Sequence, residues 1–295
     1  MSYLWLILAL ALLGFFACAY AMARALVRPA PPSPPDSPER YGLPYESVQF
    51  LSRDGLRLDA WWMPASQATQ RTVIICHGRE GSRERELPHA QSLHRAGFNV
   101  LMFDFRAHGR SEGQYVTFGM YEKDDLLGAL DFLAARGIER VGVLGFSLGA
   151  TTAIIAAAIT DRIAAIVAEG AVARLKPTLA RRLWRYGVPL PLGWLLAAWA
   201  LAFATTITRG RIDQVDAVRW IGHIRAPILL IHGARDDLVS AAEVAELAAR
   251  CGSRAVVWQV AGAGHHEASR VAPQAFEQRT LAWFAQYLPS EQADC

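Results

Sequence analysis

The chain has 295 residues, enough for one large domain or two small ones. Hydrophobic residues make up 53% of it and charged residues 19%, against about 25% charged residues in a typical soluble domain, so part of the chain is unusually apolar. The formal net charge of +3 is too small to indicate a protein that binds nucleic acid.

The N-terminal segment, residues 1–23, contains no formally charged side chain and consists largely of Leu, Ala, Ile, Phe and Trp. A helix of this length rises about 35 Å, enough to cross a hydrocarbon core of about 30 Å. We therefore predict that this segment is a retained transmembrane anchor, so that the protein is attached to a membrane. Arg24 and Arg28 follow the segment and favour the cytoplasmic side for the rest of the chain.

Two other interpretations of this segment stay open. A cleaved signal peptide would use the small residues between positions 17 and 23, although no basic residue precedes Tyr3. A lipoprotein signal would use Cys18, although the bulky Phe15 and Phe16 stand directly before it.

Residues 24–44 are predicted to be a linker. Six prolines lie between Pro29 and Pro38, and so dense a run of proline cannot form a regular helix or a sheet. We expect an extended spacer between the membrane and the folded domain.

Short apolar runs alternate with helical patterns from residue 45 to residue 171 and again from residue 225 to residue 295. A hairpin is expected around Asp54-Gly55, a strong turn pair. The predicted strands are residues 48–51, 56–62, 72–76, 100–103, 141–144, 163–168, 228–231 and 256–260. The predicted helices are residues 82–96, 119–136, 147–159, 241–250 and 273–287. Because most strands are continuous Val/Ile/Leu runs, the pattern predicts an eight-stranded, mostly parallel sheet with helices on both faces.

Residues 172–224 interrupt this alternation. They contain no strand signal, and the first part, residues 174–185, is rich in arginine, whereas residues 186–208 are mostly apolar and include tryptophans. Pro189, Pro191 and Gly193 are expected to limit the second helix to about 16 residues, which is short for a membrane span. We predict an inserted helical cap whose basic, tryptophan-bearing surface contacts the bilayer.

The sequence Gly145-Phe146-Ser147-Leu148-Gly149 lies between a predicted strand and a predicted helix. This is the G-x-S-x-G pattern in the context that it requires, where a strained turn exposes the serine hydroxyl. The same turn directs the amide of Leu148 and the helix N-terminus toward a developing oxyanion. Ser147 is therefore the candidate nucleophile.

A serine hydroxyl needs a base that a third group orients. Asp236 follows the predicted strand 228–231 and is the candidate acid, with Asp237 as the competing neighbour. His265 follows Gly264 in the loop after the last predicted strand and is the candidate base, with His266 as the alternative.

Residues 48–287 resemble the α/β-hydrolase superfamily, in particular its monoacylglycerol-lipase-like and serine-aminopeptidase-like branch. Four motifs carry the resemblance, in chain order: His77-Gly78 after a strand, the run from Asp104 to Ser111, the Ser147 turn, and the His232-Gly233 to Asp236 run followed by His265.

The resemblance implies that the amide of Arg79 supplies a second oxyanion donor beside Leu148. It also implies that residues 104–111 are structural and that residues 172–224 form a lid over the site. Some members of the superfamily place the acid at the position that Glu169 occupies here, so Glu169 is the alternative to Asp236. Neither a metal ion nor an organic cofactor is expected, since a serine triad needs none.

The predicted activity is hydrolysis of carboxylic esters, with a small-molecule or lipid ester of medium to long acyl chain as substrate. The same triad serves peptide and thioester cleavage, so a serine peptidase or a thioesterase stays open. A third possibility is a non-catalytic, membrane-bound binding protein of the same fold.

Overall fold

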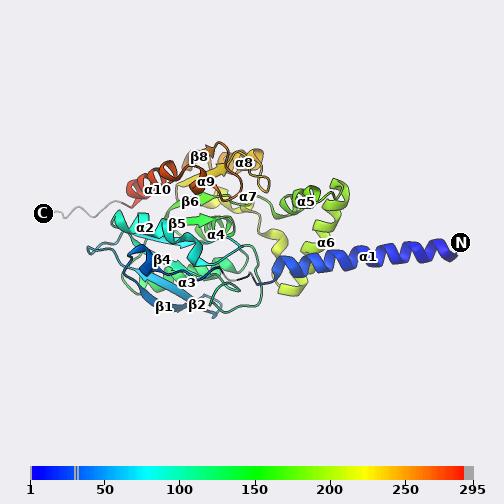
Figure 1. Ribbon diagram of the computed structural model, residues 1–295, viewed down its shortest axis with the longest axis horizontal. Coiled ribbons are helices and arrows are strands. Elements are labelled where there is room, and N and C mark those ends of the chain that lie inside the picture. Colours follow the sequence, from blue (N-terminus) through cyan, green and yellow to red (C-terminus); the bar gives the residue numbers. More distant parts are fainter. Residues whose placement is uncertain (1, 30, 32, 289–295) are drawn as a thin grey trace.

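The computed structural model describes residues 2–29, 31 and 33–288. Eight strands form one sheet in the order β1-β2-β4-β3-β5-β6-β7-β8 (Figure 1). β2 runs antiparallel to both of its neighbours, and every other pair from β4 to β8 is parallel. The bounds are β1 Glu46–Leu51, β2 Arg57–Met63, β3 Thr72–Cys76, β4 Asn99–Phe103, β5 Val141–Phe146, β6 Ile163–Glu169, β7 Ile228–Gly233 and β8 Ala255–Val260. The predicted eight-stranded, mostly parallel sheet is confirmed.

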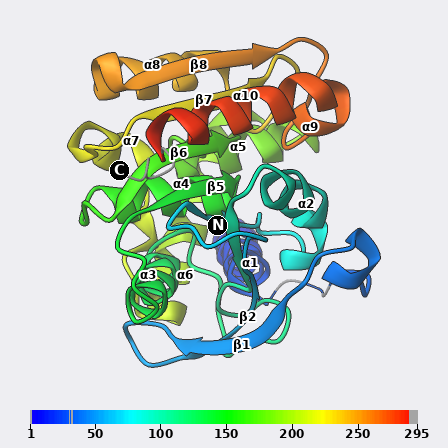
Figure 2. The same cartoon turned by 90° about the vertical axis from the view of Figure 1, so that its left-hand side faces the viewer.

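Helices cover both faces of this sheet, as Figure 2 shows in a view along the long axis of the molecule. One face packs against α2 (Leu87–Arg95) and α10 (Pro273–Tyr287), whose buried side chains share a core with those of β3 and β4. The other face packs against α3 (Glu122–Ala134), α4 (Leu148–Ala157) and α8 (Ala241–Cys251). Short helical segments complete the fold: α7 Ala217–Trp220, α9 Ala268–Val271, and the 3-10 turns η1 Pro38–Tyr41, η2 Arg83–Glu86, η3 Ile212–Gln214, η4 Ile221–His223 and η5 Gly252–Arg254.

Two helices begin later than their sequence patterns indicate. The predicted helix 82–96 starts as the 3-10 turn η2, and α2 begins only at Leu87, with a proline in its first turn. The predicted helix 119–136 starts at Glu122, because the Glu122 carboxylate accepts hydrogen bonds from the amides of Thr117 and Gly119 and so holds the preceding residues in a turn.

Three helices lie beyond the end of the sheet in Figure 1: α1 (Ser2–Val27), α5 (Leu175–Arg185) and α6 (Leu190–Thr208). α1 continues past residue 23 into the predicted linker. The residues there can adopt helical backbone geometry, because the prolines, which would interrupt a helix, begin only at Pro29. By length and composition alone, α1 and α6 are both long and apolar enough to span a membrane, a test that signal sequences and core helices also pass.

α6 has 19 residues, so the estimate of about 16 residues for this helix was wrong. Pro191 lies in the first turn, where the missing N–H has no helical partner to lose, and the helix therefore tolerates it. α6 packs beside α1 through edge-to-face contacts of Phe16 with Trp199, at 4.8 Å between ring centroids, and of Tyr20 with Phe203, at 5.6 Å. Both contacts advance by four residues in the same direction, so the two helices run in the same sense where they touch.

The proline-rich segment forms no helix or strand among its described residues before η1, but it is not a free spacer. Ser33 and Ser82 exchange hydrogen bonds between backbone amides and hydroxyl oxygens, at 2.8 and 3.3 Å. Pro38 is buried. The chain between α1 and the sheet is therefore fixed to the domain surface.

Candidate active site

Ser147 lies on a sharp turn between β5 and α4, with φ 47° and ψ −103°. A non-glycine residue at positive φ is strained, at a cost of about 1–3 kcal/mol, and persists only where its surroundings hold it. Here the Ser147 amide donates to the Glu169 carbonyl at 2.8 Å. Two glycines make the turn possible: a Cβ on Gly149 would lie 2.1 Å from the Cys76 carbonyl oxygen, and one on Gly145 would lie 2.7 Å from the Ala150 amide nitrogen.

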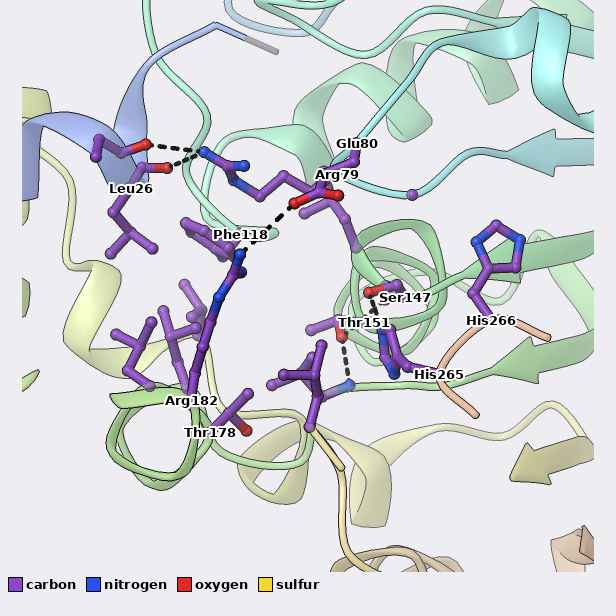
Figure 3. Close-up of a pocket in the computed structure, with 18 of the residues that line it drawn as sticks. Leu26, Arg79, Glu80, Phe118, Ser147, Thr151, Thr178, Arg182, His265 and His266 are labelled. Carbon is purple, nitrogen blue, oxygen red and sulfur yellow. Dashed lines mark hydrogen bonds and ion pairs between the residues drawn. The ribbon is translucent and has the colours of Figure 1, made fainter. Parts of the chain in front are cut away.

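His265 lies in the loop between β8 and α9 and reaches Ser147 across the end of the sheet (Figure 3). Its Nε2 is 2.8 Å from the Ser147 Oγ, and its Nδ1 is 2.8 Å from Oδ2 of Asp236. A carboxylate oxygen accepts but does not donate, so Nδ1 carries the proton and Nε2 is left to accept from the serine hydroxyl. This is the hydrogen-bonding state in which an imidazole can act as a general base toward serine.

Asp236 follows β7, and its side chain is 1% exposed. Its Oδ1 accepts from the amides of Leu238 and Val239, each at 2.9 Å, while Oδ2 faces His265. Burial opposes ionisation, but the His265 ring and the two amides outweigh it and hold the pKa of Asp236 below its usual value. The group is therefore a carboxylate at neutral pH, suited to stabilise an imidazolium.

The competing residues point elsewhere. Asp237 is exposed and forms an ion pair with Arg185 at 2.5 Å. His266 stacks on Phe146 and faces Glu86, with 3.5 Å between Nε2 and Oε1. Thus the structure brings together the two residues preferred from sequence, Asp236 and His265, and directs both neighbours away from Ser147.

Glu169 and His232 are close to the site but do not complete it. Oε1 of Glu169 accepts from the Ala268 amide at 2.8 Å, and burial raises the pKa of this carboxyl group. His232 Nδ1 is 4.0 Å from Asp236 Oδ2, and burial lowers the pKa of the His232 ring, which keeps it neutral. Asp236 therefore has one short imidazole partner, His265.

Two backbone amides border Ser147 as candidate oxyanion donors. The amide of Leu148 is at the first position of α4, where a helix leaves N–H groups without internal partners. In the described chain, neither this amide nor that of Arg79 donates a hydrogen bond to protein. Gly78 is directly beside Ser147, since a Cβ placed on it would lie 3.8 Å from the Ser147 Cβ.

His77 holds the peptide that carries the Arg79 amide, a role that sequence patterns did not reveal. Its Nε2 accepts from the Phe105 amide at 3.0 Å, so Nδ1 carries the proton and donates to the Gly78 carbonyl at 2.7 Å. That carbonyl belongs to the same peptide plane as the Arg79 N–H. Burial, followed by the nearby His108, lowers the pKa of His77 well below its usual value and keeps the ring neutral. Residues 104–108 thus help to hold His77, and through it the peptide beside Ser147, in place.

A pocket of about 580 Å³ opens above Ser147 and His265. Figure 3 shows that its walls come from distant parts of the chain: the end of α1, the loop after β3 and helix α5. Apolar side chains form much of the lining, including Met22, Leu26, Phe118, Leu175, Leu179 and Leu183. In the described ranges no group of three or more His, Cys, Asp or Glu side chains is arranged to hold a metal ion.

Comparison with known proteins agrees with this architecture. Residues 71–215 match the alpha/beta hydrolase fold family. The uncharacterized protein YqkD of Bacillus subtilis is 34% identical over 59% of this chain, and the chain spans only 58% of the length of that relative. The alpha/beta hydrolase domain-containing protein WAV2 of Arabidopsis thaliana is 28% identical over 75% of this chain and 71% of its own length. Among solved structures, the esterase Pf2001 of Pyrococcus furiosus superposes with a TM-score of 0.75 at 28% identity, covering 89% of this chain and 98% of its own.

Asp236→Asn should separate the two neighbouring aspartates. The neutral amide neither fixes the imidazole in the required tautomer nor stabilises its charged form, and by analogy with other triads we expect the rate of substrate hydrolysis to fall by about 10³- to 10⁴-fold. Asp237→Asn removes an exposed carboxylate of the same size and should stay within about threefold of the parent enzyme. Equal losses in the two variants would contradict the assignment of Asp236.

Proposed function

Because the chain belongs to the α/β-hydrolase superfamily, we propose that it is a membrane-anchored serine hydrolase that cleaves carboxylic esters through an acyl-enzyme. The observation that carries the proposal is the continuous hydrogen-bonded line from Ser147 through His265 to Asp236, with both links at 2.8 Å. A serine at a strained turn, with an imidazole at hydrogen-bonding distance on one side and two backbone amides nearby, is equipped for acyl transfer.

The chemistry follows from these positions. His265 accepts the Ser147 proton as Oγ attacks the ester carbonyl carbon, and the amides of Leu148 and Arg79 stabilise the oxyanion. The Asp236 carboxylate stabilises the imidazolium, which then protonates the leaving alcohol as the C–O bond breaks. Water, deprotonated by His265, attacks the acyl-enzyme, and the proton returns to Ser147 as the carboxylic acid leaves.

The pocket supports esters with a substantial acyl chain. Its leucine-rich walls suit an apolar chain, and each buried CH₂ contributes about 0.8 kcal/mol. Helices α5 and α6 act in this proposal as the lid, and exposed aromatic side chains on these helices (Trp184 and Trp194) and between them (Tyr186) suit a bilayer interface. A lipid ester would then reach Ser147 from the membrane side.

In this proposal α1 is retained as the anchor, and it also completes the pocket. Ala19, Ala23 and Val27 are buried along one helix face, whereas the first half of α1 is exposed. The Arg79 guanidinium donates to the carbonyls of Ala25 and Leu26, at 3.0 and 2.8 Å, and so caps the last turn of α1. Cleavage by a signal peptidase between positions 17 and 23 would remove most of α1 and leave Ala25 and Leu26, the partners of Arg79, without the helix that holds them.

A fluorophosphonate probe tests the nucleophile directly. The full-length protein in a neutral detergent should be labelled covalently, and Ser147→Ala should abolish the labelling and lower ester turnover by about 10⁴-fold or more. Ser111→Ala provides the matched control, because that hydroxyl donates to the Asp104 carbonyl away from the pocket, and this variant should still be labelled. A folded parent protein that takes up no probe would favour a non-catalytic binding protein.

A series of p-nitrophenyl esters tests the substrate class. We expect kcat/KM to rise from acetate toward octanoate, by roughly fourfold for each CH₂ that reaches the apolar walls. Rates corrected for the Ser147→Ala background give the measurement. A maximum at acetate would exclude an acyl-binding pocket.

Truncation tests the role of α1. A chain that begins at Gly14 loses only exposed turns and should hydrolyse p-nitrophenyl butyrate in detergent within about twofold of the full chain. A chain that begins at Arg28 loses the pocket wall, and we expect at least about tenfold lower kcat/KM and a lower unfolding temperature. If the chain that begins at Arg28 has the same kcat/KM and the same unfolding temperature as the chain that begins at Gly14, α1 is not part of the site.

A further inference from the structure

The rim of the pocket carries an excess of positive charge. Five arginines line the pocket, whereas Glu80 is the single acidic residue among its lining residues. The five are Arg28, Arg79, Arg85, Arg182 and Arg185.

Three of these arginines already have partners. Arg185 is paired with Asp237, Arg79 caps the end of α1, and Arg85 donates to the Glu80 carbonyl at 3.3 Å. These side chains are therefore held in place by the protein itself.

Arg28 and Arg182 are different. In the part of the chain that the structure describes, the Arg28 side chain has no ion pair or hydrogen bond. Arg182 approaches only Glu80, at 3.9 Å, and half of its side chain is exposed. Figure 3 shows Arg182 extending from α5 across the pocket toward Glu80 and the loop that carries Arg79. Two cations thus flank the opening above Ser147 with most of their hydrogen-bonding capacity unused.

These charges repel one another. Burial is the main cause that lowers the pKa of the Arg79 guanidinium; Glu80 opposes it, and Arg182 and Arg28 lower this pKa further. An anion placed between Arg28 and Arg182 would relieve the repulsion and gain charge-assisted hydrogen bonds, which guanidinium groups form in pairs with phosphate and carboxylate. The same arginines would repel a cationic substrate, so a substrate with a free amine is disfavoured.

We infer that the pocket binds amphiphilic esters that carry an anionic group, with the acyl chain on the leucine-rich walls and the phosphate or carboxylate between Arg28 and Arg182. The inference rests on the proposed ester hydrolysis and assigns its substrate class. Arg28 directly follows α1, and Arg182 lies on α5, so the two elements that border the membrane-facing side of the pocket each supply one ligand. The reaction is unchanged: water cleaves the ester bond, and the anionic group stays on the leaving alcohol.

The test compares two esters with the same chain in micelles of a neutral detergent: 1-oleoylglycerol 3-phosphate and 1-oleoylglycerol. For the full-length protein we expect kcat/KM to be at least about tenfold higher for the phosphate ester. Arg28→Gln and Arg182→Gln should each lower this ratio several-fold, and the double variant should bring it to about one. Arg225→Gln is the matched control, since Arg225 is a highly exposed arginine paired with Asp161 away from the pocket, and it should leave the ratio unchanged.

A second arm separates a substrate-binding site from attraction to an anionic bilayer. The neutral ester is presented in phosphatidylcholine vesicles with and without phosphatidylglycerol. If the arginines bind the substrate, phosphatidylglycerol leaves the rate on the neutral ester unchanged within about twofold. If phosphatidylglycerol raises the rate on the neutral ester by as much as the preference for the phosphate ester, the inference is overturned in favour of surface binding.

Equal kcat/KM for the two esters in the parent protein, with cleavage that depends on Ser147, would overturn this inference alone. No Ser147-dependent cleavage of either ester would overturn the proposed function as well.

Discussion

The arrangement of the site depends on one close approach of backbone segments. Gly149, at the start of α4, packs so tightly against the Cys76 carbonyl at the end of β3 that no side chain fits between them. This contact seats the N-terminus of α4 at the carboxyl edge of the sheet and leaves Ser147 on a turn with positive φ. The strain is held by a sheet buried on both faces, and its result is a hydroxyl that faces the pocket instead of the core.

The position of the His265 imidazole is also fixed by a small number of contacts. Asp236 uses one oxygen to anchor its own loop through two amides and the other to orient His265. Behind Ser147, His77 uses both ring nitrogens to fix the peptide that offers the Arg79 amide. Catalytic geometry of this kind requires that each group be held by a further contact, because a misplaced donor loses most of its effect.

The pocket connects this chemistry to the N-terminal helix. The last turn of α1 forms part of the wall above Ser147, and the side chain that caps this turn belongs to Arg79, whose backbone borders the nucleophile. In the proposed function, a lipid ester would leave the bilayer beside α1 and the α5–α6 pair and meet the serine a short distance away. The anchor would then determine where the substrate comes from and complete the pocket that receives it.

Much of the fold could be predicted from local patterns. Buried parallel strands read as continuous apolar runs, and Gly145 and Gly149 around Ser147 mark a turn, because these features express backbone preferences of the residues themselves. The sequence favoured Asp236 over Asp237 and His265 over His266, but the directions of these side chains on their loops, which no period in the sequence specifies, came only from the structure. The cap that Arg79 places on α1 and the position of Arg28 and Arg182 on one pocket were decided by tertiary structure alone. Both bring together segments far apart in the chain, and they depend on how those segments pack, not on the residues that flank them in sequence.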